Sequence, residues 1–226
     1  MLGTGRMVKH FCGMFRLKTV VPIWEKIVGS TDSTLNKIDT PDTLASLGFF
    51  VPGSTVLDLG CGSAPFTDLI RTFPISAYVG MDIRRTALAT ARQRNLPPHF
   101  LFLELSDLYN PAYNGVGRVS PTSFTIPFLP DMFSSIICHS LFTHLETEGI
   151  AACYMREITK VLRPKGLLWT TWFRSPPNDV STSALRTVYP DRFIRHLLAS
   201  YDIIYEKGGD STAYHDQWEL GLRLRP

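Results

Sequence analysis

The chain has 226 residues, a formal net charge of +3, 44% hydrophobic residues and 19% charged residues. This composition is typical of a single globular domain that can bury a full core without disulfide or metal support. The small net charge does not indicate a nucleic-acid partner, and no run of about 18 apolar residues predicts a membrane span.

The first part of the chain is basic and apolar. Residues 7–28 are rich in aliphatic and aromatic side chains, and the first acid of the chain is Glu25. A helix of this kind covers one edge of the core with its basic side in solvent, which we favour, or makes peripheral contact with a membrane. Lys9, Arg16 and Lys18 interrupt the apolar stretch, so we expect no secretory signal.

From Thr40 onward, apolar runs alternate with helix-like stretches, which is the element order of a parallel α/β sheet. Thr40 and Pro41 are typical of a helix start, and that helix should end near Gly48. The predicted strands cover residues 55–59, 78–82, 100–105, 134–139, 167–173, 201–206 and 216–224. Further predicted helices cover residues 65–73, 84–94, 148–161 and 191–200.

Two long connections leave the carboxyl ends of predicted strands, at residues 110–131 and 174–189. In an open parallel sheet the ligand lies outside these strand ends, so we expect both connections to shape the ligand pocket. The first contains Tyr113, Phe124 and Phe128, and these aromatic side chains favour a lid over an unstructured linker.

The turn after the first predicted strand indicates a nucleotide-like ligand. Residues 56–64 join an apolar run to small residues, and Gly60 and Gly62 let the backbone turn sharply against a ligand. The Gly-Lys-Ser or Gly-Lys-Thr sequence of a phosphate-binding loop does not follow. Asp58 suits a ligand with an ammonium or sulfonium group, and S-adenosylmethionine has both. Asp82 ends the next strand and can accept hydrogen bonds from ribose hydroxyls.

With these motifs in this order, the chain resembles the class I S-adenosylmethionine-dependent methyltransferases over residues 47–223. The resemblance rests on residues 58–62, 82, 104–108, 133–145 and 162–166. Many members have a third glycine at the position of Ala64 and an aspartate at that of Ser134. The resemblance implies an α/β fold, with a Rossmann-like seven-stranded, mostly parallel sheet, helices on both faces and an antiparallel last strand. It also implies an S-adenosylmethionine-binding domain (47–226), and the basic apolar segment before that domain is expected to form an N-terminal helical cap (1–46).

The resemblance further implies that S-adenosyl-L-methionine is the cofactor, with Asp82 as the ribose-binding acid and residues 104–108 near the adenine. His139 would line the methionine part. The expected cofactor-binding residues are Asp58, Gly60, Cys61, Gly62, Ser63, Asp82, Ile83, Ser106, Asp107, Leu108, His139 and Ser140.

His144 is the expected catalytic base, because it follows the fourth predicted strand on the cofactor side. An alcohol acceptor has a high pKa and benefits from a positioned base. Glu146 or Glu148 could orient the imidazole. The alternative is a histidine at a helix start that only packs or caps, since a single histidine is weak evidence without its partner geometry.

The four cysteines, Cys12, Cys61, Cys138 and Cys153, show no paired metal spacing. We interpret them as free thiols in a reducing compartment, which favours a cytoplasmic location. No cluster of acids has the spacing of metal ligands, so we expect no metal site.

Residues 109–111, 124–128 and 140–144 are similar to those of bacterial enzymes that methylate sugars or secondary metabolites. The expected function is therefore methyl transfer to the oxygen of a small hydroxylated acceptor, such as a sugar, a glycolipid or a secondary metabolite. The alternatives are an RNA or protein methyltransferase and a catalytically inactive scaffold of the same fold. Aminopropyl transfer would need an acidic polyamine-binding cluster, which the sequence does not show.

Overall fold

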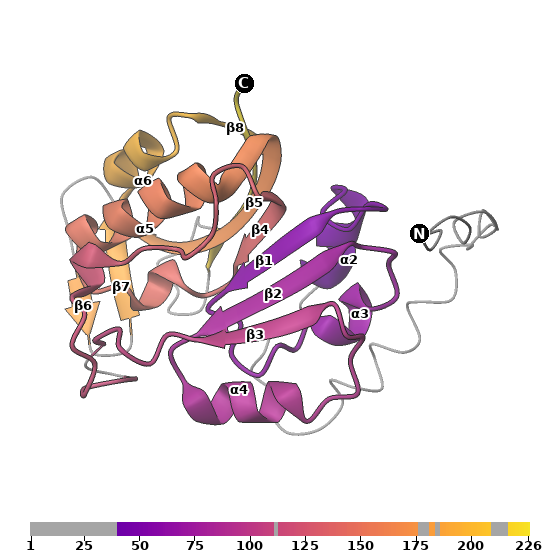
Figure 1. Ribbon diagram of the computed structural model, residues 1–226. Helices are drawn as coiled ribbons and strands as arrows, with labels where there is room; N and C mark the ends of the chain where they lie inside the picture. Colours follow the sequence, from indigo (N-terminus) through magenta and orange to yellow (C-terminus); the bar gives the residue numbers. More distant parts are fainter. Residues whose placement is uncertain (1–39, 111–112, 176–180, 184–185, 209–216) are drawn as a thin grey trace, which may run out of the picture. The chain divides into compact units, whose positions relative to one another are not determined.

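The structure, a computed structural model, describes residues 40–110, 113–175, 181–183, 186–208 and 217–226 (Figure 1). The compact unit that contains them runs from Asp39 to Pro226. The basic apolar segment at residues 7–28, predicted to cover one edge of the core or to contact a membrane, lies outside the described residues, as does most of the predicted cap (1–46).

The core is a mixed β-sheet that places the carboxyl ends of its parallel strands at one edge (Figure 1). The main path has the order β3-β2-β1-β4-β5-β9-β8, and only β9 runs antiparallel to its neighbours. This arrangement confirms the predicted seven-stranded sheet with an antiparallel last strand. The strands are β1 (Thr55–Leu59), β2 (Ala77–Asp82), β3 (Phe100–Glu104), β4 (Phe133–Cys138), β5 (Leu162–Ser175), β6 (Ser181–Ser183), β7 (Arg186–Pro190), β8 (Tyr201–Lys207) and β9 (Trp218–Leu224).

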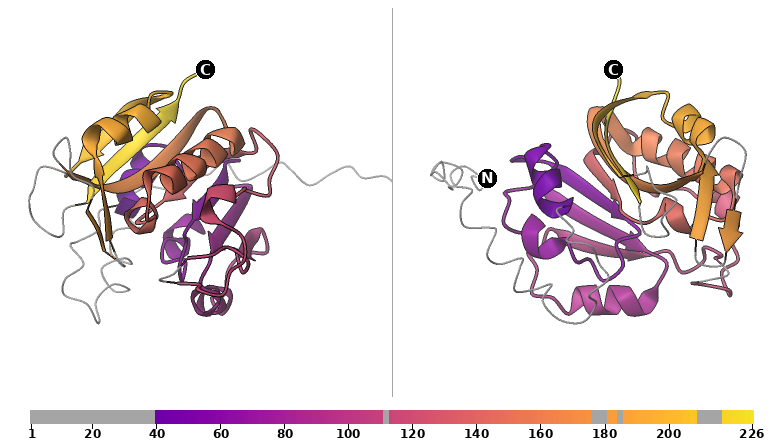
Figure 2. Two further views of the ribbon diagram at one scale, coloured as in Figure 1. Left: turned by 90° about the vertical axis from the view of Figure 1, so that its left-hand side faces the viewer. Right: turned by 180° about the vertical axis from the view of Figure 1, so that it is seen from behind.

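Helices cover both faces of the sheet, as expected from its apolar strands (Figures 1 and 2). Apolar residues of α5 and α6 share one core cluster with Val79 and Met81 of β2. On the opposite face, Leu88 and Ala91 of α4 pack with Phe102 of β3. The helices are α2 (Thr40–Ser46), α3 (Thr67–Ile70), α4 (Arg85–Arg92), α5 (Glu148–Val161) and α6 (Asp191–Leu197), with 3₁₀ turns η2 (Pro121–Ser123) and η3 (Phe142–His144).

Helix α5 begins and ends at the predicted residues because its local signals agree. The Thr147 hydroxyl accepts a hydrogen bond from the Ile150 N–H at 3.2 Å, which satisfies one of the free donors of the first turn. Ile150, Tyr154 and Ile158 then recur at helical spacing and are buried. The helix therefore presents one apolar side to the sheet and lines the site with that side.

The connection at residues 174–189 differs from its prediction. It contains a two-stranded hairpin, in which β7 pairs antiparallel with β6 and parallel with the end of β5. β5 extends beyond its pairings with both β4 and β9, and its last residues pair with β7. The β6–β7 hairpin depends on pairing with a strand elsewhere in the chain and not on an alternation of apolar residues within its own sequence. The sequence therefore did not predict it. None of the described residues of this connection lines the pocket described below.

The connection at residues 110–131 packs against α5 with little regular structure. The Glu157 carboxylate accepts a hydrogen bond from the Ile126 N–H at 3.1 Å and an ion pair from Lys160 at 2.6 Å. Burial raises the pKa of this carboxyl, but these two donors outweigh burial and hold the pKa below its usual value. The Phe124 ring stacks on Tyr154 with ring centroids 4.1 Å apart. These contacts hold the segment beside the site.

Gly80 of β2 is a point of close packing beneath the site. A Cβ at this position would lie 2.8 Å from Phe102 Cδ1 and 2.9 Å from Cys61 Sγ. Gly80 pairs with Asp58 in the sheet, and the Tyr78 hydroxyl on the same strand donates to the Asp58 carboxylate at 2.7 Å. There is therefore no room at this position for any side chain, and only glycine fits.

Substitution Gly80→Ala should lower the free energy of unfolding by about 1–3 kcal/mol, because an added methyl group overpacks a buried site. The matched control is Gly115→Ala, where an added Cβ meets no atom within 4 Å. Urea denaturation of both variants measures the effect, and equal midpoints for the two would contradict this packing account.

Candidate cofactor and acceptor site

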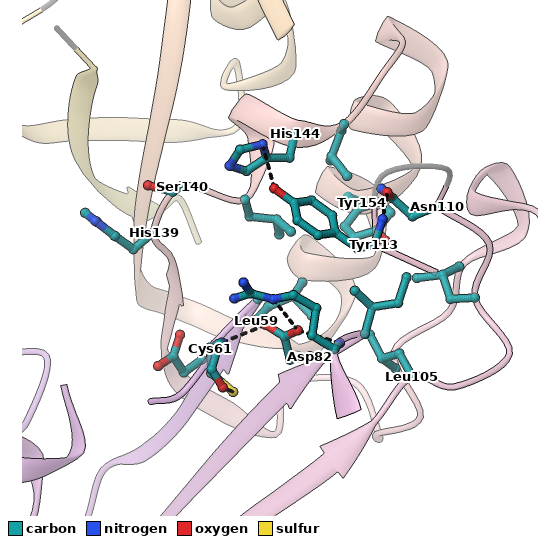
Figure 3. Close-up of a pocket in the computed structure, with 18 of the residues that line it drawn as sticks. Leu59, Cys61, Asp82, Leu105, Asn110, Tyr113, His139, Ser140, His144 and Tyr154 are labelled. Atoms are coloured by element: carbon teal, nitrogen blue, oxygen red, sulfur yellow. Dashed lines mark hydrogen bonds and ion pairs between the residues drawn. The ribbon is translucent and has the colours of Figure 1, made fainter. Parts of the chain in front are cut away.

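A cavity of about 310 Å³ opens at the carboxyl ends of β1, β2 and β4 (Figure 3). Its wall is formed by the β1–α3 turn, the end of β2, the segment after β3, the exit of β4 and the start of α5. The lining residues are Asp58, Leu59, Gly60, Cys61, Gly62, Ser63, Pro65, Phe66, Asp82, Ile83, Arg84, Leu105, Leu108, Tyr109, Asn110, Tyr113, Pro121, His139, Ser140, Leu141, His144, Leu145, Glu146, Ile150 and Tyr154.

The β1–α3 turn is tied to the end of β2 by its backbone. The N–H groups of Gly60 and Cys61 both donate to the Met81 carbonyl oxygen, at 2.7 and 3.1 Å. Gly60 and Gly62 have φ angles of +80° and +57°, which side chains disfavour. A Cβ on Gly60 would also lie 3.2 Å from Leu141 Cδ1. The two glycines therefore keep the turn open toward the cavity.

Ala64 adopts the backbone conformation that a third glycine would adopt. Its φ angle is +55°, in the left-handed region, and the residue is fully buried with Leu88 and Ala91. A non-glycine residue in this region costs about 1–2 kcal/mol. Ala64 therefore differs from the third glycine of the family motif in its side chain but keeps the same turn geometry.

The Asp82 carboxylate holds the turn from the side of β2. Its Oδ2 accepts a hydrogen bond from the Gly62 N–H at 2.6 Å, and its Oδ1 accepts one from the Arg84 N–H at 2.7 Å. The Arg84 Nε lies 3.4 Å from the same Oδ1. The motifs gave no indication of Arg84, although its place two residues after Asp82 put a basic side chain within reach of that acid.

The Asp58 carboxylate is buried at the end of β1, 2% exposed. Burial raises the pKa of Asp58 to about 7, the Tyr78 hydroxyl opposes this by donating to the carboxylate, and the Asp82 charge adds to it. Burial beside these two acids also raises the pKa of the Cys61 thiol, which therefore stays protonated. The floor of the cavity thus has one acid that titrates near neutral pH.

The exit of β4 places His139 and Ser140 on the wall. The His139 ring contacts Phe66 edge-on at a centroid distance of 5.4 Å, and its Nδ1 is buried without a hydrogen-bond partner. Burial lowers the pKa of His139 to about 4, so its imidazole is neutral near pH 7. The Ser140 N–H donates to Thr171 Oγ1 at 2.7 Å, and its hydroxyl lies 3.2 Å from Gln217 Oε1.

His144 is the last residue of η3 and contacts the segment after β3 (Figure 3). Its Nδ1 lies 3.3 Å from the Tyr113 hydroxyl oxygen, and the two rings meet edge to face at 89°. The Arg84 guanidinium carbon lies 5.5 Å from the centroid of the Tyr113 ring. Glu146, a predicted orienting residue, lines the same cavity and is exposed.

The cavity brings together most of the residues expected from the sequence. Ten of the twelve expected cofactor-binding residues line it, together with His144. Ser106 and Asp107 do not belong to this wall: the Ser106 carbonyl accepts from the Asn114 side chain, and the exposed Asp107 carboxylate pairs with Arg118. The sequence did not single out Leu59, Pro65, Phe66, Leu141, Leu145, Ile150 or Tyr154 as site residues, because only tertiary packing turns these side chains toward the cavity.

The profile of the family described as "Methyltransferase domain" matches residues 57–170, which include the turn, both acids and the β4 exit. This chain belongs to the class I S-adenosylmethionine-dependent methyltransferases. The resemblance found in the motifs is therefore confirmed, and S-adenosylmethionine is the cofactor of this methyltransferase.

Solved structures show the same fold. A methyltransferase from Methanosarcina mazei has 13% identity and a TM-score of 0.59, with 80% of this chain and 97% of that chain covered. N-methyltransferase NodS from Bradyrhizobium japonicum has 15% identity, a TM-score of 0.59 and coverages of 87% and 100%. The cyclase SpnF has 16% identity, a TM-score of 0.63 and coverages of 91% and 92%. Identities this low support the fold alone.

Within the part of the chain that the structure describes, no helix is long and apolar enough to cross a membrane. No group of three or more histidine, cysteine, aspartate or glutamate side chains in that part of the chain could hold a metal ion.

The buried Asp58 predicts a pH-dependent stability. Its folded-state pKa of about 7 exceeds the ordinary 3.8, so the folded state binds more protons than the unfolded state between these values. The resulting stabilisation is fully present below about pH 4 and is lost as pH rises through about 7, by up to about 4 kcal/mol.

Urea denaturation across this pH range should show the free energy of unfolding of the wild type falling relative to that of Asp58→Asn. The control is Asp202→Asn, which changes an exposed carboxylate paired with Arg225. Parallel curves for wild type and Asp58→Asn would contradict the raised pKa.

Proposed function

We propose that this methyltransferase transfers a methyl group to the oxygen of a small hydroxylated acceptor, such as a sugar, a glycolipid or a secondary metabolite. The observation that supports the proposal best is that His144 shares one cavity with the cofactor turn. The remaining wall combines the amide of Asn110 with the rings of Tyr109, Tyr113 and Tyr154, which suits a compact acceptor with hydroxyl groups and apolar faces.

The residues of the site fit S-adenosylmethionine. The glycine turn leaves space that a Cβ would fill, and Asp82 can accept from ribose hydroxyls. Asp58, whose pKa burial raises to about 7, provides negative charge for a cationic ligand when it is ionised. The unpartnered Nδ1 of His139 offers a further polar contact on the β4 side. Leu108 and Ile83 line the same wall, where they suit the apolar faces of an adenine.

The residues on the acceptor side orient the acceptor, exclude water and move its proton. When bound, the cofactor supplies an electrophilic methyl group: the acceptor oxygen bonds to the methyl carbon, the carbon–sulfur bond breaks, and its electron pair stays on sulfur. His144 takes the hydroxyl proton, which raises the rate for an alcohol by roughly a hundred- to ten-thousand-fold. The buried side chains of Ile150 and Leu145 keep water from this part of the cavity.

A macromolecular acceptor is the second candidate, and two observations disfavour it. The net charge of +3 gives little attraction for phosphates, and the cavity of about 310 Å³ suits a small molecule better than a nucleic-acid or protein segment. We therefore propose that the acceptor is not a nucleic acid.

Substitution Asp82→Asn should weaken S-adenosylmethionine binding by about 1.5–3 kcal/mol, because a charged acceptor of hydrogen bonds is lost. Asparagine keeps the size of the side chain and one carbonyl oxygen, so the turn is disturbed less than by alanine. Calorimetric titration measures the change, with Asp202→Asn as the control for an equal change of charge on the surface. Unchanged affinity in Asp82→Asn would remove Asp82 as the ribose-binding acid.

The acceptor proposal is tested with the purified chain, labelled cofactor and a panel of sugars, glycolipids, phenols, RNA and protein. We expect transfer to the oxygen of a small molecule, and His144→Gln should lower turnover by roughly a hundredfold or more while cofactor affinity is kept. Transfer to RNA, protein or nitrogen would overturn the proposed acceptor. Full turnover of His144→Gln would remove His144 as the base.

A further inference from the structure

Tyr113 lies between His144 and the cofactor turn, with contacts on both sides (Figure 3). Its hydroxyl oxygen is 3.3 Å from His144 Nδ1. Its ring lies beside the Arg84 guanidinium, which in turn contacts the Asp82 carboxylate. A chain of contacts thus leads from Asp82 across the cavity to His144, and Tyr113 is its middle member.

The charge of Arg84 decides the direction of the contact between Tyr113 and His144. A cation 5.5 Å from the ring centroid draws electron density from the phenol, which makes its hydroxyl a better donor and a poorer acceptor. This favours the tautomer of His144 in which the Tyr113 hydroxyl is the donor and Nδ1 accepts with its lone pair. A neutral imidazole with this lone pair has its proton on Nε2, so His144 can accept a further proton only at Nδ1.

From this tautomer we infer that Tyr113 is a catalytic residue that relays the acceptor proton to His144, an inference that rests on the proposed oxygen methylation. The acceptor hydroxyl proton moves to Tyr113 Oη as the original phenol proton moves to His144 Nδ1. Tyr113 ends the step as a neutral phenol, His144 becomes an imidazolium, and the acceptor oxygen is free to bond to the methyl carbon. The 3.3 Å separation is long for such a step, and contacts of this kind shorten when substrate binds.

Tyr113→Phe tests the relay because it removes the hydroxyl and keeps the ring beside Arg84. We expect kcat to fall by roughly a hundredfold or more, as in His144→Gln, while calorimetric affinity for S-adenosylmethionine stays within about twofold. The double variant Tyr113→Phe/His144→Gln should be no slower than either single variant, since the two residues move one proton. The control is Tyr205→Phe, which removes a tyrosine hydroxyl on β8, where the ring packs on Trp169 away from the cavity.

A second readout needs no turnover. Nitrogen-15 NMR of the unliganded chain should show the His144 tautomer with its proton on Nε2 and a hydrogen-bonded Nδ1, and Tyr113→Phe should shift the Nδ1 resonance. A proton on Nδ1 in the wild type would overturn the assigned direction and the relay with it.

The outcomes separate this inference from the proposed function. If His144→Gln is impaired and Tyr113→Phe keeps wild-type kcat, the relay is overturned and His144 acts as a base without Tyr113. If both single variants are fully active, base catalysis at this site is overturned, together with the relay. Equal, non-additive losses support the relay.

Discussion

The site depends on how the ends of β1 and β2 are joined. The Met81 carbonyl accepts two N–H groups of the turn after β1, and the Asp82 carboxylate accepts a third from Gly62. Each bond satisfies a buried backbone donor that would otherwise cost about 1–3 kcal/mol. The turn is therefore rigid and aimed at the cavity by its own neighbours in the sheet. The cofactor contacts proposed for this turn follow from that constraint.

Negative charge at the strand ends sets the electrostatics of the rest of the cavity. The Asp82 charge contributes to the raised pKa of Asp58, so the two carboxyl groups are close enough to interact. Each of them has a different partner. The neutral Tyr78 hydroxyl donates a hydrogen bond to Asp58, and the positively charged Arg84, which lines the cavity, pairs with Asp82. Arg84 then places positive charge beside Tyr113, so the acid at the end of β2 is linked through Arg84 to the tyrosine that contacts His144.

The acceptor side is built from a segment with little regular structure, so its precision has to come from packing. Helix α5 provides that support, because Glu157 holds the backbone at Ile126 and Tyr154 stacks on Phe124. The Cys153 thiol also donates to the carbonyl oxygen of Thr122 at 3.2 Å. These anchors hold residues 122–126, and nearer the site the Tyr113 N–H donates to Asn110 Oδ1 at 3.1 Å.

Local patterns in the sequence were sufficient for the main elements and the cofactor half of the site. β1 and α5 have the predicted bounds, because apolar continuity and a capping residue act over a few residues of chain. Asp58, Gly60, Gly62 and Asp82 could be recognised because the turn geometry demands small residues and acids at fixed strand ends.

Only the tertiary structure decided the contacts that no local pattern encodes. The β6–β7 hairpin joins the sheet because the end of β5 extends past both β4 and β9 and can pair with β7. Arg84 and Tyr113 meet because the segment after β3 folds back over the turn. Such contacts depend on side chains that are far apart in sequence and on the packing between them. The sequence by itself therefore determined the fold class and the cofactor, while the tertiary structure decided which side chains from distant segments line the cavity beside the cofactor turn.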